Sequence, residues 1–342
     1  MPTNSNIQPL NIKSLGIQPN WQTDLSQGIS STDKLLEYLQ LDPQQLTVSQ
    51  QACLDFPLRV PWPFVHRMET GNPHDPLLAQ VLPIAAEMSS TAGYSDDPLD
   101  ESKHNPVPGI VHKYANRLLL IVSPNCAINC RYCFRRHFPY AENRQSKAQW
   151  QKALDYISSS SEVNEVIYSG GDPLAANDKF LSWLTEQIAA IPHIKRLRIH
   201  SRLPVVIPSR INPQFFSWAS KTRLKPILVL HINHANEIDQ AVETGIAQCI
   251  DEGITILNQT VLLKGINDNV ATLSALSEKL FDCGVMPYYL HLLDPVAGAS
   301  HFDIDLGRAK QIYALLQADL PGFLVPKLVR EIAGKNHKTL IV

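Results

Sequence analysis

Three cysteines lie close together in the stretch SPNCAINCRYCFRRHFPY, residues 123–140. Cys126, Cys130 and Cys133 have the spacing C-x3-C-x2-C and make up half of the six cysteines in the chain. Closely spaced thiolates bind zinc or an iron–sulfur cluster. A structural zinc site needs four ligands, so zinc would require His137 as the fourth. A four-iron cube held by three cysteines instead leaves one iron open for a small molecule.

Polar residues and glycines follow several of the later apolar runs. Glycine allows a ligand to approach the backbone closely, so the stretch YSGGDPL is a candidate ligand contact. Each of these residues also has an ordinary interpretation, as part of a turn or as a satisfied polar group at the end of a strand. The candidates are Ser169, Gly170, Gly171, Asp172, Ser201, His231, Gln259 and Asp294.

Composition excludes several classes of protein. The chain has 342 residues, is 44% hydrophobic and carries a formal charge of −2, so broad electrostatic binding of nucleic acid is not expected. No apolar run is long enough to span a membrane, and the N-terminus lacks the apolar core of a signal peptide. We therefore expect a cytoplasmic protein, in which thiols stay reduced and clustered cysteines bind metal.

Strand-like and helix-like segments alternate from residue 117 onward. Such alternation predicts parallel strands joined by crossover helices, in an open doubly wound sheet or in a complete or partial barrel. In both folds, ligands bind at the carboxyl ends of the strands, which is where the candidate residues fall. The predicted strands span residues 117–123, 165–170, 196–201, 225–232, 255–263 and 285–293, each followed by a helix.

The first hundred residues have a different composition from the rest of the chain. They are rich in Pro, Gln, Asn and Ser, with short amphipathic pieces, and residues 95–109 have the pattern of an exposed connection. We expect an N-terminal helical and irregular extension at 1–105 and a strand–helix domain at 106–300. A C-terminal helix and tail at 301–342 completes the predicted organisation.

The cysteine spacing, in a loop after the first strand of a strand–helix array, resembles the radical S-adenosylmethionine (SAM) superfamily. The resemblance implies an α/β fold, a partial parallel (β/α)6 barrel. It also implies a [4Fe–4S] cluster on Cys126, Cys130 and Cys133, SAM on the open iron, and a one-electron reductant. SAM contacts are implied for the other matching residues, Ser169, Gly170, Gly171, Asp172, Ser201, His231 and Gln259.

The segments RYCFRRHF, RIHSRLPVVIP, HINHANE and NQTVLLKGIND resemble the lysine 2,3-aminomutase family, from about residue 105 to the end. That family pairs SAM with pyridoxal 5′-phosphate (PLP), which needs a lysine amine. Lys338, followed by Thr339, matches the family's lysine. Lys335 is the competitor, although no threonine follows it. The stretch AGKNHK has one glycine where the family has several, so this loop departs from the family pattern.

The same resemblance implies how L-lysine is bound. Arg135 matches the arginine that grips the substrate carboxylate, for which a planar guanidinium is well suited. Asp294 and Glu331 match the acids that bind the side-chain ammonium, with glutamate at 331 in place of the family's aspartate. Tyr114 and Arg117 match positions near PLP.

The Pro/Gln-rich N-terminal region, the short tail and the ending VPKLVREI are similar to the bacterial subgroup that serves elongation factor P. This similarity implies conversion of (S)-α-lysine to (R)-β-lysine and a functional link to elongation factor P and its lysyl ligase. The alternatives are a catabolic lysine 2,3-aminomutase, a homologue that acts on glutamate or arginine, a radical SAM enzyme that acts on RNA or protein, and a zinc-stabilised binding module. The sequence leaves open whether the chain forms a homo-oligomer.

Overall fold

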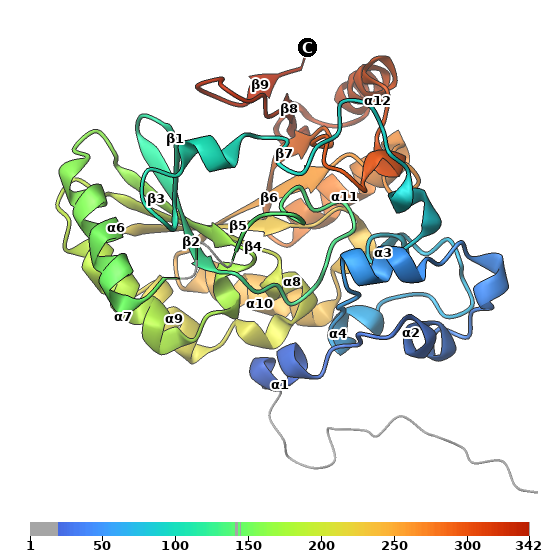
Figure 1. The fold of residues 1–342 in the computed structure, drawn as a ribbon, viewed down its shortest axis with the longest axis horizontal. Coiled ribbons are helices and arrows are strands. Elements are labelled where there is room, and N and C mark those ends of the chain that lie inside the picture. Colours follow the sequence, from blue (N-terminus) through green and yellow to red (C-terminus); the bar gives the residue numbers. More distant parts are fainter. Residues whose placement is uncertain (1–19, 141–142, 144, 342) are drawn as a thin grey trace, which may run out of the picture.

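The computed structural model of the chain describes residues 20–140, 143 and 145–341. Its centre is a nine-stranded sheet, formed by the described residues, in which the strands follow sequence order from β1 to β9 (Figure 1). The strands from β2 to β8 pair in parallel. Their bounds are β2 Arg117–Ser123, β3 Glu165–Gly170, β4 Arg196–Ser201, β5 Lys225–His231, β6 Thr255–Val261, β7 Met286–His291 and β8 Lys327–Arg330.

A helix follows each strand from β2 to β7, as the alternation predicted. Each helix begins after a Ser, Asn or Asp whose side chain accepts a hydrogen bond from a backbone N–H of the first turn, which stabilises the helix start. The predicted parallel partial barrel is therefore confirmed. The helices are α6 Lys147–Ser159, α7 Asp178–Ala189, α9 Pro213–Ala219, α10 Gln240–Asp251, α11 Val270–Asp282 and α12 Leu306–Asp319, with the short α8 Leu203–Val206 between β4 and α9.

Three strands at the two edges of the sheet were not predicted. β1 (Ile110–Tyr114) pairs antiparallel with β2, and β9 (Thr339–Leu340) pairs antiparallel with β8. Within the described part of the chain no pairing joins β1 to β9, so the sheet is an open, partial barrel. β8 and β9 are too short to show a clear sequence pattern, but their hairpin carries the segment from Glu331 to Lys338 back toward the strand ends.

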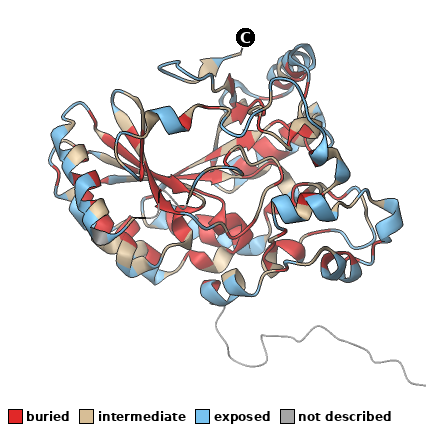
Figure 2. Ribbon diagram, in the orientation of Figure 1, coloured by how far each residue is buried: buried red, intermediate tan, exposed pale blue. Residues whose placement is uncertain are grey.

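The N-terminal segment lies against one side of the strand–helix array (Figure 1). It contains the short helices α1 Trp21–Ser26, α2 Thr32–Tyr38, α3 Gln50–Asp55, α4 Trp62–Val65 and α5 Pro76–Ala79. Its buried side chains join the same hydrophobic core as those of the array, as the contact of α4 with α8 illustrates. Figure 2 shows the buried strands at the centre and the exposed outer faces of the helices. The division of the chain at residues 105 and 300 stays a prediction.

The expectation of an exposed connection at residues 95–109 is wrong in part. Leu99 and Glu101 are buried, although Ser102 and Lys103 beside them are exposed. Glu101 begins a 3-10 helix, η4 (Glu101–His104). Its carboxylate accepts a hydrogen bond from Arg135, which lies in the loop after β2 that carries the three cysteines, called the cysteine loop below. In the part of the chain that the structure describes, no helix has the length and apolar character needed to cross a membrane.

Candidate functional site

A cavity of about 680 Å³ lies inside the partial barrel and extends from the carboxyl ends of the strands to the beginnings of β2, β3 and β4. Its volume is in the range of sites that bind small molecules and cofactors. The cavity brings together nearly all of the residues that the sequence singled out. These are Cys126, Cys130, Cys133, Tyr114, Arg117, Arg135, Ser169, Gly170, Gly171, Asp172, His231, Gln259, Asp294, Glu331 and Lys338.

The three thiols line this cavity without meeting at one point. Among the described residues, no group of three His, Cys, Asp or Glu side chains is close enough to hold a single metal ion. The ring of His137 lies near Ala297 O, at 3.2 Å, and near Asp96, outside the lining of the cavity. Zinc ligands must converge on one ion, whereas the cysteines of a cube bind separate irons. The placement therefore fits an iron–sulfur cluster better than zinc.

Burial raises the pKa of Cys126 well above its usual range and raises that of Cys133 to about 11. Each neighbouring thiol adds to the effect, because a second negative charge would lie close by. A bound metal reverses this preference, since a coordinating thiol is deprotonated outright. The protein surroundings therefore favour neutral thiols at Cys126 and Cys133, and these two thiols would lose their protons on binding a cluster.

The cysteine loop is fixed from outside by the N-terminal segment. Arg131 is fully buried and bonds to both carboxylate oxygens of Glu87, at 2.8 and 2.5 Å. Arg136 donates to the same carboxylate at 2.9 Å. Arg131 also donates to the backbone carbonyls of Phe56 and Ala52. These charge-assisted bonds hold the loop that carries the cysteines.

The glycine stretch after β3 passes very close to the cysteine loop. Gly170 has φ +125°, and a Cβ there would lie 2.4 Å from the carbonyl oxygen of Ser123. A Cβ at Gly171 would lie 2.7 Å from the carbonyl oxygen of Asn125. Only glycine fits this approach of two backbones, so these residues are explained by local packing as well as by ligand contact.

Asp172 joins the ends of β3 and β4. Its carboxylate accepts hydrogen bonds from Ser201 Oγ at 2.7 Å and from the backbone N–H groups of Arg202, Leu203 and Leu174. Burial raises its pKa to about 6, and these bonds oppose that rise. Ser201 lies behind Asp172 and does not line the cavity. Asp172 lines the cavity, and Ser201 holds its carboxylate in place from behind. The SAM contact expected of Ser201 stays a prediction.

Arg135 is buried in the wall of the cavity, but its guanidinium already has a carboxylate partner. It bonds to the two oxygens of Glu101 at 2.7 and 2.8 Å and donates to Ser169 Oγ at 2.9 Å. In this arrangement Glu101 occupies the bidentate face that a substrate carboxylate would need. Glu101 could not be recognised in the sequence, because residues 95–109 lack any apolar periodicity.

Lys338 lies in the cavity and is paired with Glu331. Its Nζ donates to Glu331 Oε2 at 2.6 Å, and Lys113 Nζ lies 3.2 Å from the other oxygen. Burial opposes ionisation of Glu331, but the two lysines outweigh it and lower its pKa to about 2. Lys335 lines a small separate pocket and does not reach the main cavity. The placement favours Lys338 over Lys335 as the cofactor lysine.

Asp294 is a buried carboxylate without a partner for one of its oxygens. Oδ1 has no hydrogen bond among the described residues, although the side chain lines the cavity. Burial is the main cause of a pKa raised to about 7, against the opposing attraction of Lys338. An unpaired buried acceptor of this kind fits a cationic ligand group.

Tyr114 and Arg117 form one wall beside Lys338. The Arg117 guanidinium lies 4.0 Å from the centre of the Tyr114 ring, and Tyr114 OH donates to Glu331 at 3.4 Å.

Gln259 and His231 also line the cavity, and Gln259 Nε2 lies 3.0 Å from His231 Nε2. Burial lowers the pKa of His231 to about 3, so this ring is neutral.

Several residues that line the cavity were missed in the sequence. His200 and His291 line the cavity, and the buried Nε2 atom of each has no partner among the described residues. Both lie at strand ends, so the rule that found His231 would have found them too. Tyr288 and Tyr289 stack at 3.8 Å between ring centres and also line the cavity.

Comparison with known proteins identifies the family. Residues 120–212 match the family model described as "Radical SAM superfamily". The chain is similar to the L-lysine 2,3-aminomutase of Haemophilus influenzae, with 53% identity over 94% of this chain and 96% of that protein. It is 52% identical to the Escherichia coli protein of the same name, over 94% of each, and 31% identical to the Clostridium subterminale protein, over 94% of this chain and 78% of that one. The chain therefore belongs to the L-lysine 2,3-aminomutase family, a family of isomerases in the radical SAM superfamily.

Proposed function

We propose that this chain is a SAM- and PLP-dependent 2,3-aminomutase that converts (S)-α-lysine to (R)-β-lysine, and that the product serves to modify elongation factor P. Membership of the radical SAM superfamily implies a [4Fe–4S] cluster and SAM. The use of PLP, the substrate and the link to elongation factor P are the further content of the proposal.

One observation carries the proposal most strongly. The same cavity is lined by the three cysteines and by Lys338, Glu331 and Asp294. The cysteines for a cluster and the lysine for PLP thus line the same cavity. PLP, when bound, supplies an aldehyde that accepts an amine and activates the carbon next to it.

The side chains fit a substrate with two amines and one carboxylate. Asp294 offers a buried oxygen without a partner, and Glu331 lies on the same side, beside Lys338. Two acids suit an ammonium group, and a glutamate substrate would leave Asp294 Oδ1 without a partner. Arg135 is the candidate for the carboxylate, provided that the substrate displaces Glu101.

The link to elongation factor P rests on similarity alone. The chain is 52–53% identical to the Escherichia coli and Haemophilus influenzae relatives and 31% identical to the Clostridium subterminale relative. The match within the family is thus stronger to the first two. The assignment to the elongation factor P subgroup itself rests on the N-terminal composition, the short tail and the VPKLVREI ending.

The experiment is an anaerobic assay of the reconstituted enzyme with SAM, PLP, a reductant and one amino acid at a time: lysine, glutamate or arginine. We expect β-lysine from lysine only, identified by mass and by chiral chromatography. Turnover of glutamate or arginine without lysine would overturn the substrate assignment. In a second step, purified elongation factor P and its lysyl ligase should accept the product in preference to α-lysine. Equal or weaker use of the product would overturn the link.

A further inference from the structure

Behind the cysteine loop, Arg202 contacts a cluster cysteine directly. Arg202 precedes α8 and is only 5% exposed. Its Nη1 atom lies 2.7 Å from the Sγ atom of Cys130. A guanidinium is always protonated and has no acceptor atom, so this contact is a charged N–H donor facing the sulfur.

The rest of the Arg202 fork is held by protein groups that come from three other segments. Nη1 also donates to Tyr132 OH at 2.8 Å, and Nη2 donates to Gln80 Oε1 at 2.6 Å and to Glu237 Oε2 at 2.8 Å. Gln80 immediately follows α5, and Glu237 ends the 3-10 helix η7 (Ala235–Glu237). With so many bonds, the guanidinium has one orientation, and that orientation presents an N–H to Cys130.

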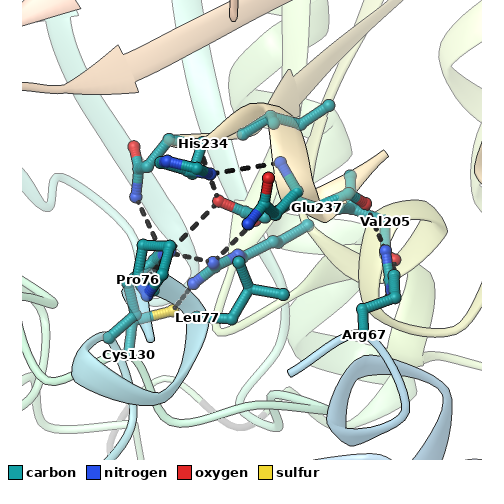
Figure 3. Close-up of polar contacts among 12 residues, drawn as sticks. Arg67, Pro76, Leu77, Cys130, Val205, His234 and Glu237 are labelled. Carbon is teal, nitrogen blue, oxygen red and sulfur yellow. Dashed lines mark hydrogen bonds and ion pairs between the residues drawn. The ribbon is translucent and has the colours of Figure 1, made fainter. Parts of the chain in front are cut away.

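Glu237 is itself fixed from the side away from the cluster. It is fully buried, and its other oxygen accepts the backbone N–H groups of Asn233 and His234. Figure 3 shows Glu237 and the sulfur of Cys130 within one set of polar contacts, with Arg67 against Val205 apart from the sulfur. The positive end of the Arg202–Glu237 pair therefore faces the cysteine, and the negative end lies behind it.

Hydrogen bonds to the cysteine sulfurs and positive charge nearby both favour the reduced state of an iron–sulfur cluster, because reduction adds negative charge. We propose that Arg202 is a positioning residue that raises the reduction potential of the cluster through its hydrogen bond to Cys130. The role of Gln80 and Glu237 is to aim the guanidinium. Through Gln80, the N-terminal segment takes part in setting how readily the cluster accepts an electron.

This inference rests on the cluster in the proposed function, but not on the identity of the amino acid or on PLP. A loaded enzyme with an altered potential in the variant but no β-lysine product would refute the substrate assignment and leave the inference standing. An enzyme that turns over lysine but keeps the same reduction potential when Arg202 is replaced would refute the inference and leave the substrate assignment standing.

The first test is a redox titration of the full-length, reconstituted enzyme without SAM, monitored by electron paramagnetic resonance. Arg202→Met should lower the equilibrium constant for one-electron reduction at least tenfold, which is about 59 mV in midpoint potential. Arg202→Lys, which keeps the charge but not the fork, should give a smaller shift. The matched control is Arg210→Met, since Arg210 is a fully buried arginine that bonds to the backbone of Leu174 and to Asp178 but not to a cysteine. The control should leave the potential unchanged.

A second measurement needs no variant. Enzyme labelled with ¹⁵N-arginine should show a weak ¹⁵N coupling to the reduced cluster in electron–nuclear double resonance. In Arg202→Lys this coupling should be lost, because the lysine carries no ¹⁵N label. Absence of any coupling in the native enzyme would overturn the proposal, even if Arg202→Met fails to bind iron. An unchanged potential in an iron-loaded Arg202→Met enzyme, or an equal shift in Arg210→Met, would also overturn it.

Discussion

At the scale of single residues, the two lysines of the tail are separated by where their side chains lie. Lys338 reaches the main cavity and Lys335 a small separate pocket. Lys338→Ala should keep the cluster but lose the visible absorption of bound PLP. Its turnover should fall by about 10²–10⁴-fold, the range for loss of one positioned catalytic group. Borohydride reduction of the native enzyme followed by peptide mapping should place the PLP label on Lys338.

The matched control is Lys335→Ala, which removes the same group from the same tail. It should retain PLP absorption and nearly full activity. Label on Lys335, or full activity in Lys338→Ala, would contradict this assignment.

The raised pKa of Asp294 predicts a pH dependence of substrate capture. The folded carboxyl has a pKa of about 7, so it is mostly protonated below that pH and mostly ionised above it. Only the ionised form attracts an ammonium, so kcat/KM for lysine should rise about tenfold per pH unit below 7 and then level off. The profile is measured between pH 5.5 and 8.5 on the anaerobic enzyme.

Asp294→Asn provides the comparison for this profile. It should lower kcat/KM by roughly 10²-fold, because a buried ammonium then lacks its counter-charge. It should also remove the limb of the profile near pH 7. A wild-type profile that is flat across this range, or a limb that persists in Asp294→Asn, would rule out Asp294 as the ammonium ligand.

At the scale of elements, one buried carboxylate ties the N-terminal segment to the cysteine loop. Glu87 neutralises both Arg131 and Arg136, and all three side chains are nearly inaccessible to water. Glu87→Gln would leave two buried guanidinium charges poorly compensated, at a cost of roughly 3–5 kcal/mol in the free energy of unfolding. Urea unfolding measures this loss, and the iron content after reconstitution should fall with it.

An exposed carboxylate serves as the control for Glu87. Glu252 pairs with Lys221 on the surface, where solvent screens the charges, so Glu252→Gln should leave both the unfolding midpoint and the iron content unchanged. Equal effects of the two substitutions, or full iron content in Glu87→Gln, would show that the cysteine loop does not depend on this tie.

The elements that the sequence predicted well are those with long, regular patterns. The strand at 165–170 and the helix that follows the strand at 117–123 were recognisable because their apolar spacing extends over several residues. β9 has only two residues and depends on pairing with β8, so no local pattern marks it. Glu101 was missed for the same reason, since only the fold brings it to Arg135.

The candidate site shows the same limit. Spacing alone picked out the cysteines, and the strand-end rule picked out His231 and Asp294. The partner of Arg135 and the position of Ser201 behind Asp172 depend on contacts between segments far apart in the chain. Such contacts leave no periodicity in one sequence.

At the scale of the whole molecule, the N-terminal segment and the strand–helix array share one apolar core. We therefore expect a single cooperative unfolding transition. Tryptophan fluorescence can report on each part separately. Trp21→Phe with Trp62→Phe leaves only the tryptophans of the array, and replacing Trp150, Trp183 and Trp218 leaves only those of the N-terminal segment. The two proteins should unfold at urea midpoints that differ from the matching far-UV circular dichroism midpoints by no more than experimental error. Separate transitions would contradict a shared core.

The central claim is that the cluster, SAM and lysine react within one cavity. The most direct measurement uses L-lysine deuterated at carbon 3 in the anaerobic reaction, with SAM and product analysed by mass spectrometry. The account predicts that deuterium moves into the 5′ position of SAM and into carbon 2 of β-lysine. β-Lysine formed while SAM stays unlabelled, or labelled lysine left unchanged by an enzyme with a full, reducible cluster, would contradict it.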